Sequence, residues 1–220
     1  MNLIIDEFKT IKANSEGLYK EKGSKFLSYL YHVKNEEEVT EKLLNLKSIH
    51  PKSRHICYAY QLGVDGTKFR MNDDGEPSGT AGRPIYNELK SFELTDSLLA
   101  VVRYFGGTKL GASGLIRAYK ESSRDVINNS KIGIEYVYQY AKIHFSHDQM
   151  GKVYNSLKTT NIEIKDQHMG MENWIKVEIR LSEFEDKLVH FQSHFHGIGK
   201  DYVTHESFKS DIRIEECVKK

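Results

Sequence analysis

Residues that can bind an anion lie close together between Arg103 and Tyr119. Three basic side chains supply fixed positive charge in this stretch: Arg103, Lys109 and Arg117. Four glycines let the backbone turn tightly and let another group come close: Gly106, Gly107, Gly111 and Gly114. A helix that begins at such a turn adds free N–H donors and the positive end of its dipole. The spacing therefore predicts an anion site, most naturally for phosphate.

The residues on either side predict the elements that hold this stretch. A continuous apolar run from Leu98 to Val102 precedes the glycines and indicates a buried strand. After the glycines, one helical face carries Leu115, Tyr119, Ser122 and Val126. We expect a strand, a glycine turn and a helix in that order. The stretch matches neither a Walker A loop nor Gly-x-Gly-x-x-Gly nor the Gly-x-Ser-x-Gly elbow, so a tight connection with ordinary solvated basic residues stays open as the alternative.

Basic and aromatic side chains near this turn indicate nucleic acid as one ligand. The whole chain has a net charge of +1, but from residue 103 to 124 a single acid, Glu121, faces five basic residues: Arg103, Lys109, Arg117, Lys120 and Arg124. Such a patch can hold a phosphate backbone with strong salt dependence. Tyr104 and Phe105, at the predicted strand end, are the best candidates to stack on bases. Core packing is the alternative for the nearby aromatics, and we expect it for at least half of them: Tyr58, Tyr60, Tyr104, Phe105 and Tyr119.

An acidic loop precedes the anion stretch. Its carboxylates are Asp73, Asp74 and Glu76, and its further residues of interest are Gly79, Thr80 and Arg83. Carboxylate oxygens suit magnesium, but such acids more often cap turns. A third interpretation pairs the loop with Arg83 or Arg103, which would set the shape of the basic site. We expect no metal and no cofactor.

The thiols and histidines give weaker signals. Cys57 beside His55 could be a nucleophile, but residues two apart on a strand do not touch, so a packed thiol is expected. His190, His194 and His196 lack the further ligands of a zinc site, and a solvated helix face is expected there. Because Cys57 and Cys217 are far apart in sequence, they indicate reduced thiols in the cytoplasm.

Composition favours a soluble globular protein. The 220 residues are 39% hydrophobic and 29% charged, and they contain no apolar run long enough to span a bilayer. The start of the chain has no basic region and only a three-residue apolar run, so we expect no secretory signal.

Patterns along the chain predict an α+β protein with two domains, 1–134 and 135–220. In the first, we expect a lead-in strand over residues 1–16 and then a strand at Lys22–Val33. Asn35 caps a helix with Val39, Leu43, Leu46 and Ile49 inward. A half-buried strand, 54–63, then leads through a turn at Asp65-Gly66 into a strand at 68–71, and Pro84 opens a short helix.

The second domain shows the order β-α-β-β-α-β, which is ferredoxin-like. Its predicted strands are 137–146, 161–168, 173–181 and 201–208. Its predicted helices are 147–158 and one capped by Ser182, with Glu185 at the third position. The tail 209–220 either adds an edge strand or stays loose.

The two glycine-containing blocks, Asp73 to Pro84 and Arg103 to Tyr119, together resemble the signature of the IMPACT/YigZ family. The resemblance is strong from Gly23 to Val126 and weak by motif after Tyr136. It departs at Ala112-Ser113, where family members more often show Gly or Ala pairs. It implies an N-terminal domain with the fold of the second domain of a small-subunit ribosomal protein, shared with GHMP kinases. It also implies a C-terminal ferredoxin-like domain similar to domain five of elongation factor G.

The resemblance also implies a function. Eukaryotic relatives regulate translation during amino-acid starvation by competing for an activator of a stress kinase. We expect this chain to lack the extra N-terminal domain used for that contact. The leading hypothesis is a non-enzymatic factor that binds RNA, the ribosome or a ribosome-associated protein, with no membrane partner. A small-molecule enzyme that binds phosphate or nucleotide, and a purely structural adaptor, are the alternatives.

Overall fold

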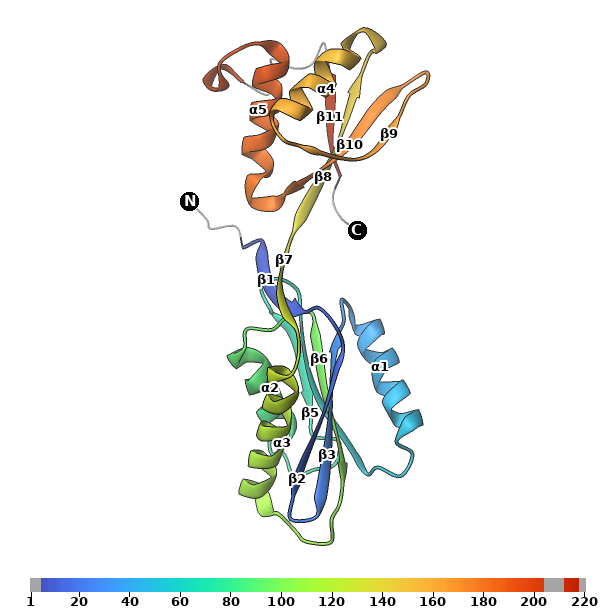
Figure 1. Ribbon diagram of the computed structural model, residues 1–220, viewed down its shortest axis with the longest axis vertical. Helices are drawn as coiled ribbons and strands as arrows, with labels where there is room; N and C mark the ends of the chain where they lie inside the picture. The colour runs from blue at the N-terminus through green and yellow to red at the C-terminus, as the bar shows by residue number, and fades with distance from the viewer. Residues whose placement is uncertain (1–4, 204–211, 218–220) are drawn as a thin grey trace. The chain divides into compact units, whose positions relative to one another are not determined.

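The computed structural model describes residues 5–203 and 212–217. The chain divides into two compact units. The first is Glu7–Glu135, and the second contains the residues from Tyr136 onward together with Asp6 (Figure 1). The division predicted from the sequence, 1–134 and 135–220, stays a prediction about domains that fold independently. Asp6 belongs to the second unit because its carboxylate accepts hydrogen bonds from Arg180 and Ser182.

A five-stranded sheet forms the centre of the first unit, in the order β2-β3-β6-β4-β5. Each strand pairs antiparallel with its neighbours. The bounds are β2 Ser15–Glu21, β3 Ser24–His32, β4 His55–Leu62, β5 Lys68–Asn72 and β6 Ser97–Tyr104. The continuous apolar run is thus part of the central strand β6. Its side chains are apolar on both sides because both faces of the sheet are covered at this strand.

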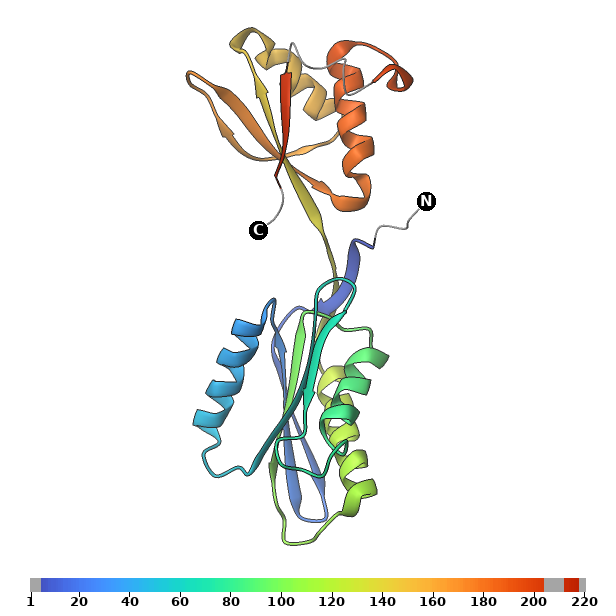
Figure 2. The same ribbon diagram turned by 180° about the vertical axis from the view of Figure 1, so that it is seen from behind.

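Helices cover both faces of this sheet, as Figures 1 and 2 show from opposite sides. Helix α1, Glu36–Ile49, packs on one face, while α2, Gly82–Ser91, and α3, Gly111–Asn128, pack on the other. The strand predicted at 54–63 is confirmed as β4, but the prediction that it is half-buried was wrong, because both of its faces are covered. Ile56 packs under α1, and Cys57 and Ala59 pack toward α2 and α3.

Helix α1 begins as predicted and is less buried than predicted. The Asn35 side chain accepts a hydrogen bond from the Glu38 N–H at 2.8 Å, which satisfies one free donor of the first turn. Val39 and Leu46 are buried, but Ile49 is 54% exposed because it lies in the last turn, beyond the edge of the core. The expected inward position of Ile49 was wrong.

Two further strands, near the first and the last residues of the first unit, were not separately predicted. β1, Glu7–Ile11, and β7, Ile132–Tyr136, form a two-stranded ribbon. The lead-in strand expected over residues 1–16 is in fact β1 followed by the start of β2, which turns into β3 at Lys22 and Gly23. Both turn residues have positive φ.

The second unit contains the predicted order β-α-β-β-α-β. Its strands are β8 Tyr138–Phe145, β9 Glu163–His168, β10 Asn173–Arg180 and β11 Ile212–Cys217, paired in the order β11-β8-β10-β9. Helices α4, Met150–Thr159, and α5, Phe184–His196, pack with the strands around one core. Short 3-10 turns precede these helices at His147–Gln149 and Leu181–Glu183.

Two predictions in this unit need correction. Ser182 does not cap a helix with its side chain, because a 3-10 turn intervenes and its N–H donates to Asp6. The last strand was placed at 201–208, but Asp201 and Tyr202 lie in a 3-10 turn and residues 204–208 lie outside the described residues. The edge strand beside β8 is β11, in the stretch first considered a tail.

The structure therefore shows a mixed helix and sheet protein with two units. The two named fold likenesses, to a ribosomal protein domain and to an elongation factor domain, stay expectations from the resemblance. Among the residues described, no helix is long and apolar enough to cross a membrane.

Candidate anion and nucleic-acid site

The predicted strand, glycine turn and helix are present as β6, the loop 105–110 and α3. At Gly106 this loop passes directly against the β2–β3 turn, where a Cβ on Gly106 would lie 1.9 Å from the carbonyl carbon of Gly23. The Ser24 hydroxyl accepts a hydrogen bond from the Gly106 N–H at 3.1 Å. This close approach requires glycine at Gly106. The two segments cross at Gly23 and Gly106, and this crossing holds the β2–β3 turn beside the loop.

The start of α3 presents open backbone. Gly107 and Gly111 have φ of 89° and 72°, and an added Cβ at either would meet no atom within 4 Å. Glycine is favoured at both positions because the backbone there is left-handed, and the space beside each Cα is open. Leu110, the residue before the helix, provides no side-chain cap. No side-chain acceptor at the cap therefore satisfies the first N–H groups of this 18-residue helix.

Arg103 is not part of an exposed basic surface. Its guanidinium is buried and its Nη1 lies 2.6 Å from Oε1 of Glu76, which is buried as well. Among the three interpretations of the acidic loop, this distance supports the one in which the loop pairs with Arg103. The pair joins the acidic loop to the end of β6, so Arg103 supports the turn and does not project from it.

Buried polar groups extend from this ion pair. The Tyr119 hydroxyl donates to Oε1 of Glu76 at 2.8 Å, and the Cys57 thiol lies 3.3 Å from the Tyr119 oxygen. Burial raises the pKa of both Cys57 and Tyr119, although the hydrogen bond from Cys57 to Tyr119 partly opposes this for the thiol. Cys57 is thus a packed, neutral thiol and a poor nucleophile at neutral pH.

The other acids of the loop bind backbone. Asp73 accepts hydrogen bonds from the N–H groups of Gly79, Ala81 and Gly82 at 2.8–2.9 Å, which holds the start of α2. Burial acts to raise the pKa of Asp73, but these three donors outweigh it and the pKa is lowered. Asp74 accepts from the Ile56 N–H at 2.6 Å.

Each of the three acids of the loop thus accepts a hydrogen bond from elsewhere in the first unit. Within the described residues, no cluster of three or more His, Cys, Asp or Glu side chains that could hold a metal ion is present. Thr80 is buried and donates to the Pro77 carbonyl, Gly79 has a φ of 75°, and Arg83 is exposed on α2. The acidic loop is therefore a structural cap and brace.

Two more arginines of the predicted basic patch have carboxylate partners. Arg117 lies 2.8 Å from Glu21, and Arg124 binds Glu88 through two nitrogens. Lys109 is exposed, and no ion pair of Lys109 occurs within the described part of the chain. The exposed positive charge of the loop itself is thus Lys109.

The two predicted aromatic platforms differ. Tyr104 is half-buried and its hydroxyl lies 3.0 Å from Nδ1 of His50, whose Nε2 contacts Tyr29 at 2.7 Å. Its ring packs under α1. Phe105 is 55% exposed. Phe105 alone of this pair offers an accessible ring.

The fold adds cations to this end of the sheet that the sequence argument missed. Lys22 sits in the turn that touches Gly106, Lys25 pairs in register with Tyr104, and Arg54 precedes the residue opposite Arg103. All three are exposed. We call Lys22, Lys25, Arg54, Phe105–Lys109 and the start of α3 the glycine-rich end. A Lys-rich turn, Lys20 to Lys25, was the available signal for its extra charge.

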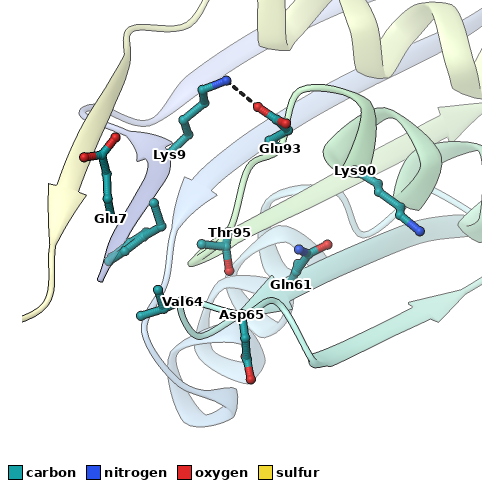
Figure 3. A pocket seen from close by; sticks show the side chains of 9 residues that line it. Glu7, Lys9, Gln61, Val64, Asp65, Lys90, Glu93 and Thr95 are labelled. Carbon is teal, nitrogen blue, oxygen red and sulfur yellow. Dashed lines mark hydrogen bonds and ion pairs between the residues drawn. The ribbon is translucent and has the colours of Figure 1, made fainter. Parts of the chain in front are cut away.

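A pocket of about 550 Å³ lies elsewhere in the first unit (Figure 3). Its wall includes β1, the β4–β5 turn and the end of α2, with Lys9 and Glu93 joined by an ion pair across it. Lys9 lowers the pKa of Glu93, and bonds from Thr67 lower that of Asp65. Both carboxylates are held in the charged form, which does not suit a general acid at neutral pH.

The histidines of α5 do not converge on one ligand site. His194 is exposed, and its Nδ1 lies 3.0 Å from the Ser156 hydroxyl. His190 and His196 are half-buried on the same helix. The solvated face predicted here holds for His194 only.

A known protein family matches most of the first unit. Residues 22–127 match the Impact N-terminal domain, a range that includes the acidic loop and the glycine-rich end. The chain is also 37% identical over 167 residues to IMPACT family member YvyE of Bacillus subtilis, covering 75% of this chain and 76% of that protein. The chain belongs to the IMPACT family.

A second family member and a solved structure are also similar to this IMPACT family chain. An IMPACT family member of Haemophilus influenzae is 32% identical over 164 residues, with 74% of this chain and 79% of the relative covered. A crystal structure of a hypothetical protein has a TM-score of 0.64 and 24% identity, and covers 87% of this chain and 95% of its own. That last likeness shows the fold alone, and it extends over both units.

Proposed function

We propose that this IMPACT family chain is a non-enzymatic, translation-linked factor of the cytoplasm that binds single-stranded RNA through the glycine-rich end. Membership of the family supports a translation-related role. The observation that carries the RNA proposal is the juxtaposition, at one end of the first unit, of exposed cations with the uncapped start of α3.

The physical argument concerns phosphate first. Lys22 and Lys109 project from two segments that meet at the Gly23–Gly106 crossing, so one phosphate backbone can reach both segments. The open backbone at Gly107 and Gly111 lets a phosphate oxygen approach the N–H groups that begin α3. The glycine-rich end thus offers point charges and backbone donors together.

The exposed ring of Phe105 adds a surface for a base. Base–aromatic stacking contributes about 1–3 kcal/mol and tolerates any sequence. Its neighbour Arg103 lies 5.7 Å from the Phe105 ring centroid, which holds the ring in place by a cation–π contact. The proposal therefore predicts affinity dominated by phosphate with little sequence preference.

Fluorescence anisotropy with a labelled single-stranded RNA across a salt series tests the proposal. Lys109→Ala and Lys22→Ala should each weaken binding almost equally for different sequences and lower the salt slope by roughly 0.7. Phe105→Ala should weaken binding with the slope unchanged. Lys90→Ala is the matched control. Lys90 is exposed in the last turn of α2 and lies outside the glycine-rich end, so this variant should bind as the wild type does.

Two results would count against this proposal. Wild-type protein that does not bind RNA in low salt rejects it, as does equal loss from Lys90→Ala and Lys109→Ala. A melting temperature raised by a nucleotide with magnesium, without RNA binding, would favour the small-molecule alternative instead.

A further inference from the structure

The hairpin of β9 and β10 ends in a turn that carries two exposed methionines. β9 is an edge strand of the sheet in the second unit, and residues 169–172 connect it to β10 (Figure 1). Met169 is 39% exposed and Met171 is wholly exposed. Neither belongs to the core of the unit. Burial therefore gives no reason for a methionine at position 171, whose thioether is open to solvent.

An imidazole nitrogen lies beside the backbone that joins the two methionines. His168 is the last residue of β9, and its side chain is exposed. A Cβ built on Gly170 would have Nε2 of His168 as its nearest neighbour, at 3.0 Å. Among the described residues, neither ring nitrogen of His168 has a hydrogen-bond or ion-pair partner. Nε2 is thus an available ligand atom that faces the middle of the turn.

Contacts with the neighbouring strands hold this turn and this ring in place. The side chain of Asn173, which is buried, accepts a hydrogen bond from the Gly170 N–H at 3.2 Å. Its amide nitrogen donates to the Phe145 carbonyl of β8 at 3.4 Å. The Trp174 ring stacks on the His168 ring, with the centroids 6.0 Å apart and an angle of 23° between the planes. Contacts that orient a ligand ring in this way are a regular feature of metal sites.

Both thioethers can reach the same point as the imidazole nitrogen. One residue separates Met169 from Met171, so their Cα atoms are at most about 7 Å apart. A methionine side chain is unbranched and has three rotatable bonds, so its sulfur can adjust to a ligand. The residue between them is glycine, which places no side chain in front of Nε2. Two sulfur atoms and one nitrogen can therefore surround one ion.

The types of these ligands select a soft metal ion. Thioether sulfur favours monovalent copper, and imidazole is a good ligand for copper as well. Zinc sites in proteins are built from thiolate, imidazole and carboxylate ligands. Magnesium and calcium take oxygen ligands. A set of one imidazole and two thioethers thus fits Cu(I) better than any of these divalent ions.

Local charge does not oppose a cation at this turn. From Glu163 to Glu178 the hairpin carries four carboxylates and two lysines. One of the four, Glu172, is exposed in the turn itself. The facing strands add two cations and one carboxylate in the rows beside Trp174: Lys142, Arg213 and Glu215. Carboxylates thus still outnumber cations around the turn when these residues are included.

We infer that the β9–β10 turn binds one monovalent copper ion through Nε2 of His168 and the sulfur atoms of Met169 and Met171. Trp174 is a positioning residue, because it holds the imidazole and does not bind the ion. The inference goes beyond the proposed function, since the turn shares no residue with the glycine-rich end and takes a different ligand. The result of an RNA-binding experiment neither supports nor overturns it.

Anaerobic titration of the full-length protein with Cu(I) tests the site. The chain contains one tryptophan, which stacks on the proposed ligand, so copper should quench its fluorescence to an end point at one equivalent. Every sample carries Cys217→Ser, because a thiol that is not buried would itself bind copper. Ag(I), a soft monovalent ion that air does not oxidise, should reach the same end point. Zn²⁺ should not compete with Cu(I).

Substitution by leucine separates the sulfur atom from the apolar bulk of methionine. Met169→Leu and Met171→Leu should each weaken Cu(I) binding at least about tenfold in competition with a coloured chelator, because loss of an outer partner of a ligand already costs about 10–100-fold. His168→Gln should weaken it by as much. Met71→Leu, at an exposed methionine of β5, is the matched control and should bind as the Cys217→Ser parent does. Circular dichroism checks that each variant is folded.

X-ray absorption at the copper edge identifies the ligands directly. The parent should show sulfur and nitrogen neighbours, and each turn methionine variant should show fewer sulfur neighbours. The site is overturned by a parent that binds no Cu(I), by copper without a sulfur neighbour, or by Zn²⁺ that displaces Cu(I). It is also overturned if the two turn methionine variants bind as tightly as Met71→Leu. Quenching at one equivalent that is lost in the three turn variants and kept in Met71→Leu supports it.

Discussion

The buried pair of Arg103 and Glu76 gives the sharpest prediction about stability. Their side chains are only 8% and 4% exposed, and Glu76 also accepts the Tyr119 hydroxyl. Arg103→Met keeps much of the side-chain volume but leaves a buried carboxylate without its cation. Breaking such a pair costs about 3–5 kcal/mol. For a unit of this size that corresponds to a fall in melting temperature of about 10–20 °C.

A second substitution in the same pair tests the reasoning. Glu76→Gln in the Arg103→Met background removes the uncompensated charge and still offers an oxygen to Tyr119, so most of the lost stability should return. Arg117→Met is the matched control. Arg117 is 62% exposed beside Glu21, and loss of that pair should cost less than about 1 kcal/mol.

Calorimetry and urea unfolding followed by circular dichroism measure these effects. Trp174 fluorescence provides an internal reference, because the only tryptophan lies in the second unit. If Arg103→Met stays within about 1 kcal/mol of wild type, or if Glu76→Gln fails to restore it, the pair is solvated and the account of the acidic loop as a brace is wrong.

Three further predictions follow from other contacts. Arg180 holds the pKa of Asp6 well below its ordinary value of 3.8, so Asp6 stabilises the fold above that pH and this contribution is lost as the pH falls below it. Asp6→Asn should cost about 2 kcal/mol in urea unfolding at pH 7, and its difference from wild type should shrink in acid; a constant difference would refute this. A thiol reagent at mild pH should label Cys217 quickly and Cys57 only on unfolding, because burial keeps the Cys57 thiol neutral; two fast thiols would contradict it. A fragment of residues 7–135 should melt cooperatively by itself, whereas solubility only in the presence of the second unit would indicate a shared core.

Local patterns were enough to predict the elements that carry the glycine-rich end. The apolar run at 98–102 became the central strand β6, and the spacing of Leu115, Tyr119 and Val126 matched the buried face of α3. These features depend on neighbours a few positions away. The first five elements of the β-α-β-β-α-β order in the second unit followed from the same kind of signal, whereas the last strand was placed at 201–208 and is in fact β11.

Long-range partners could not be predicted in this way. Arg103 was predicted in the anion site, and its pairing with the acidic loop was one of three open interpretations. The carboxylate that binds it lies 27 positions earlier, so local spacing could not decide between them. Ser182 had the type and spacing of a cap, but Asp6 accepts from its backbone. Lys22 reached the glycine-rich end only because two glycine segments cross. In each case a tertiary contact decided the role of a residue whose local sequence favoured another one.

The position of Asp6 has a consequence for the order of events during synthesis. Asp6 is synthesised before Arg180, to which it binds, and Arg180 is added 174 positions later. At about 5–20 residues per second the Asp6 carboxylate waits roughly 10–35 s in water for its guanidinium. All residues of the first unit are synthesised before Arg180, so the pair of Asp6 and Arg180 can form only after that unit is complete in sequence. A nascent chain that stops before Arg180 therefore leaves the Asp6 carboxylate without its guanidinium partner.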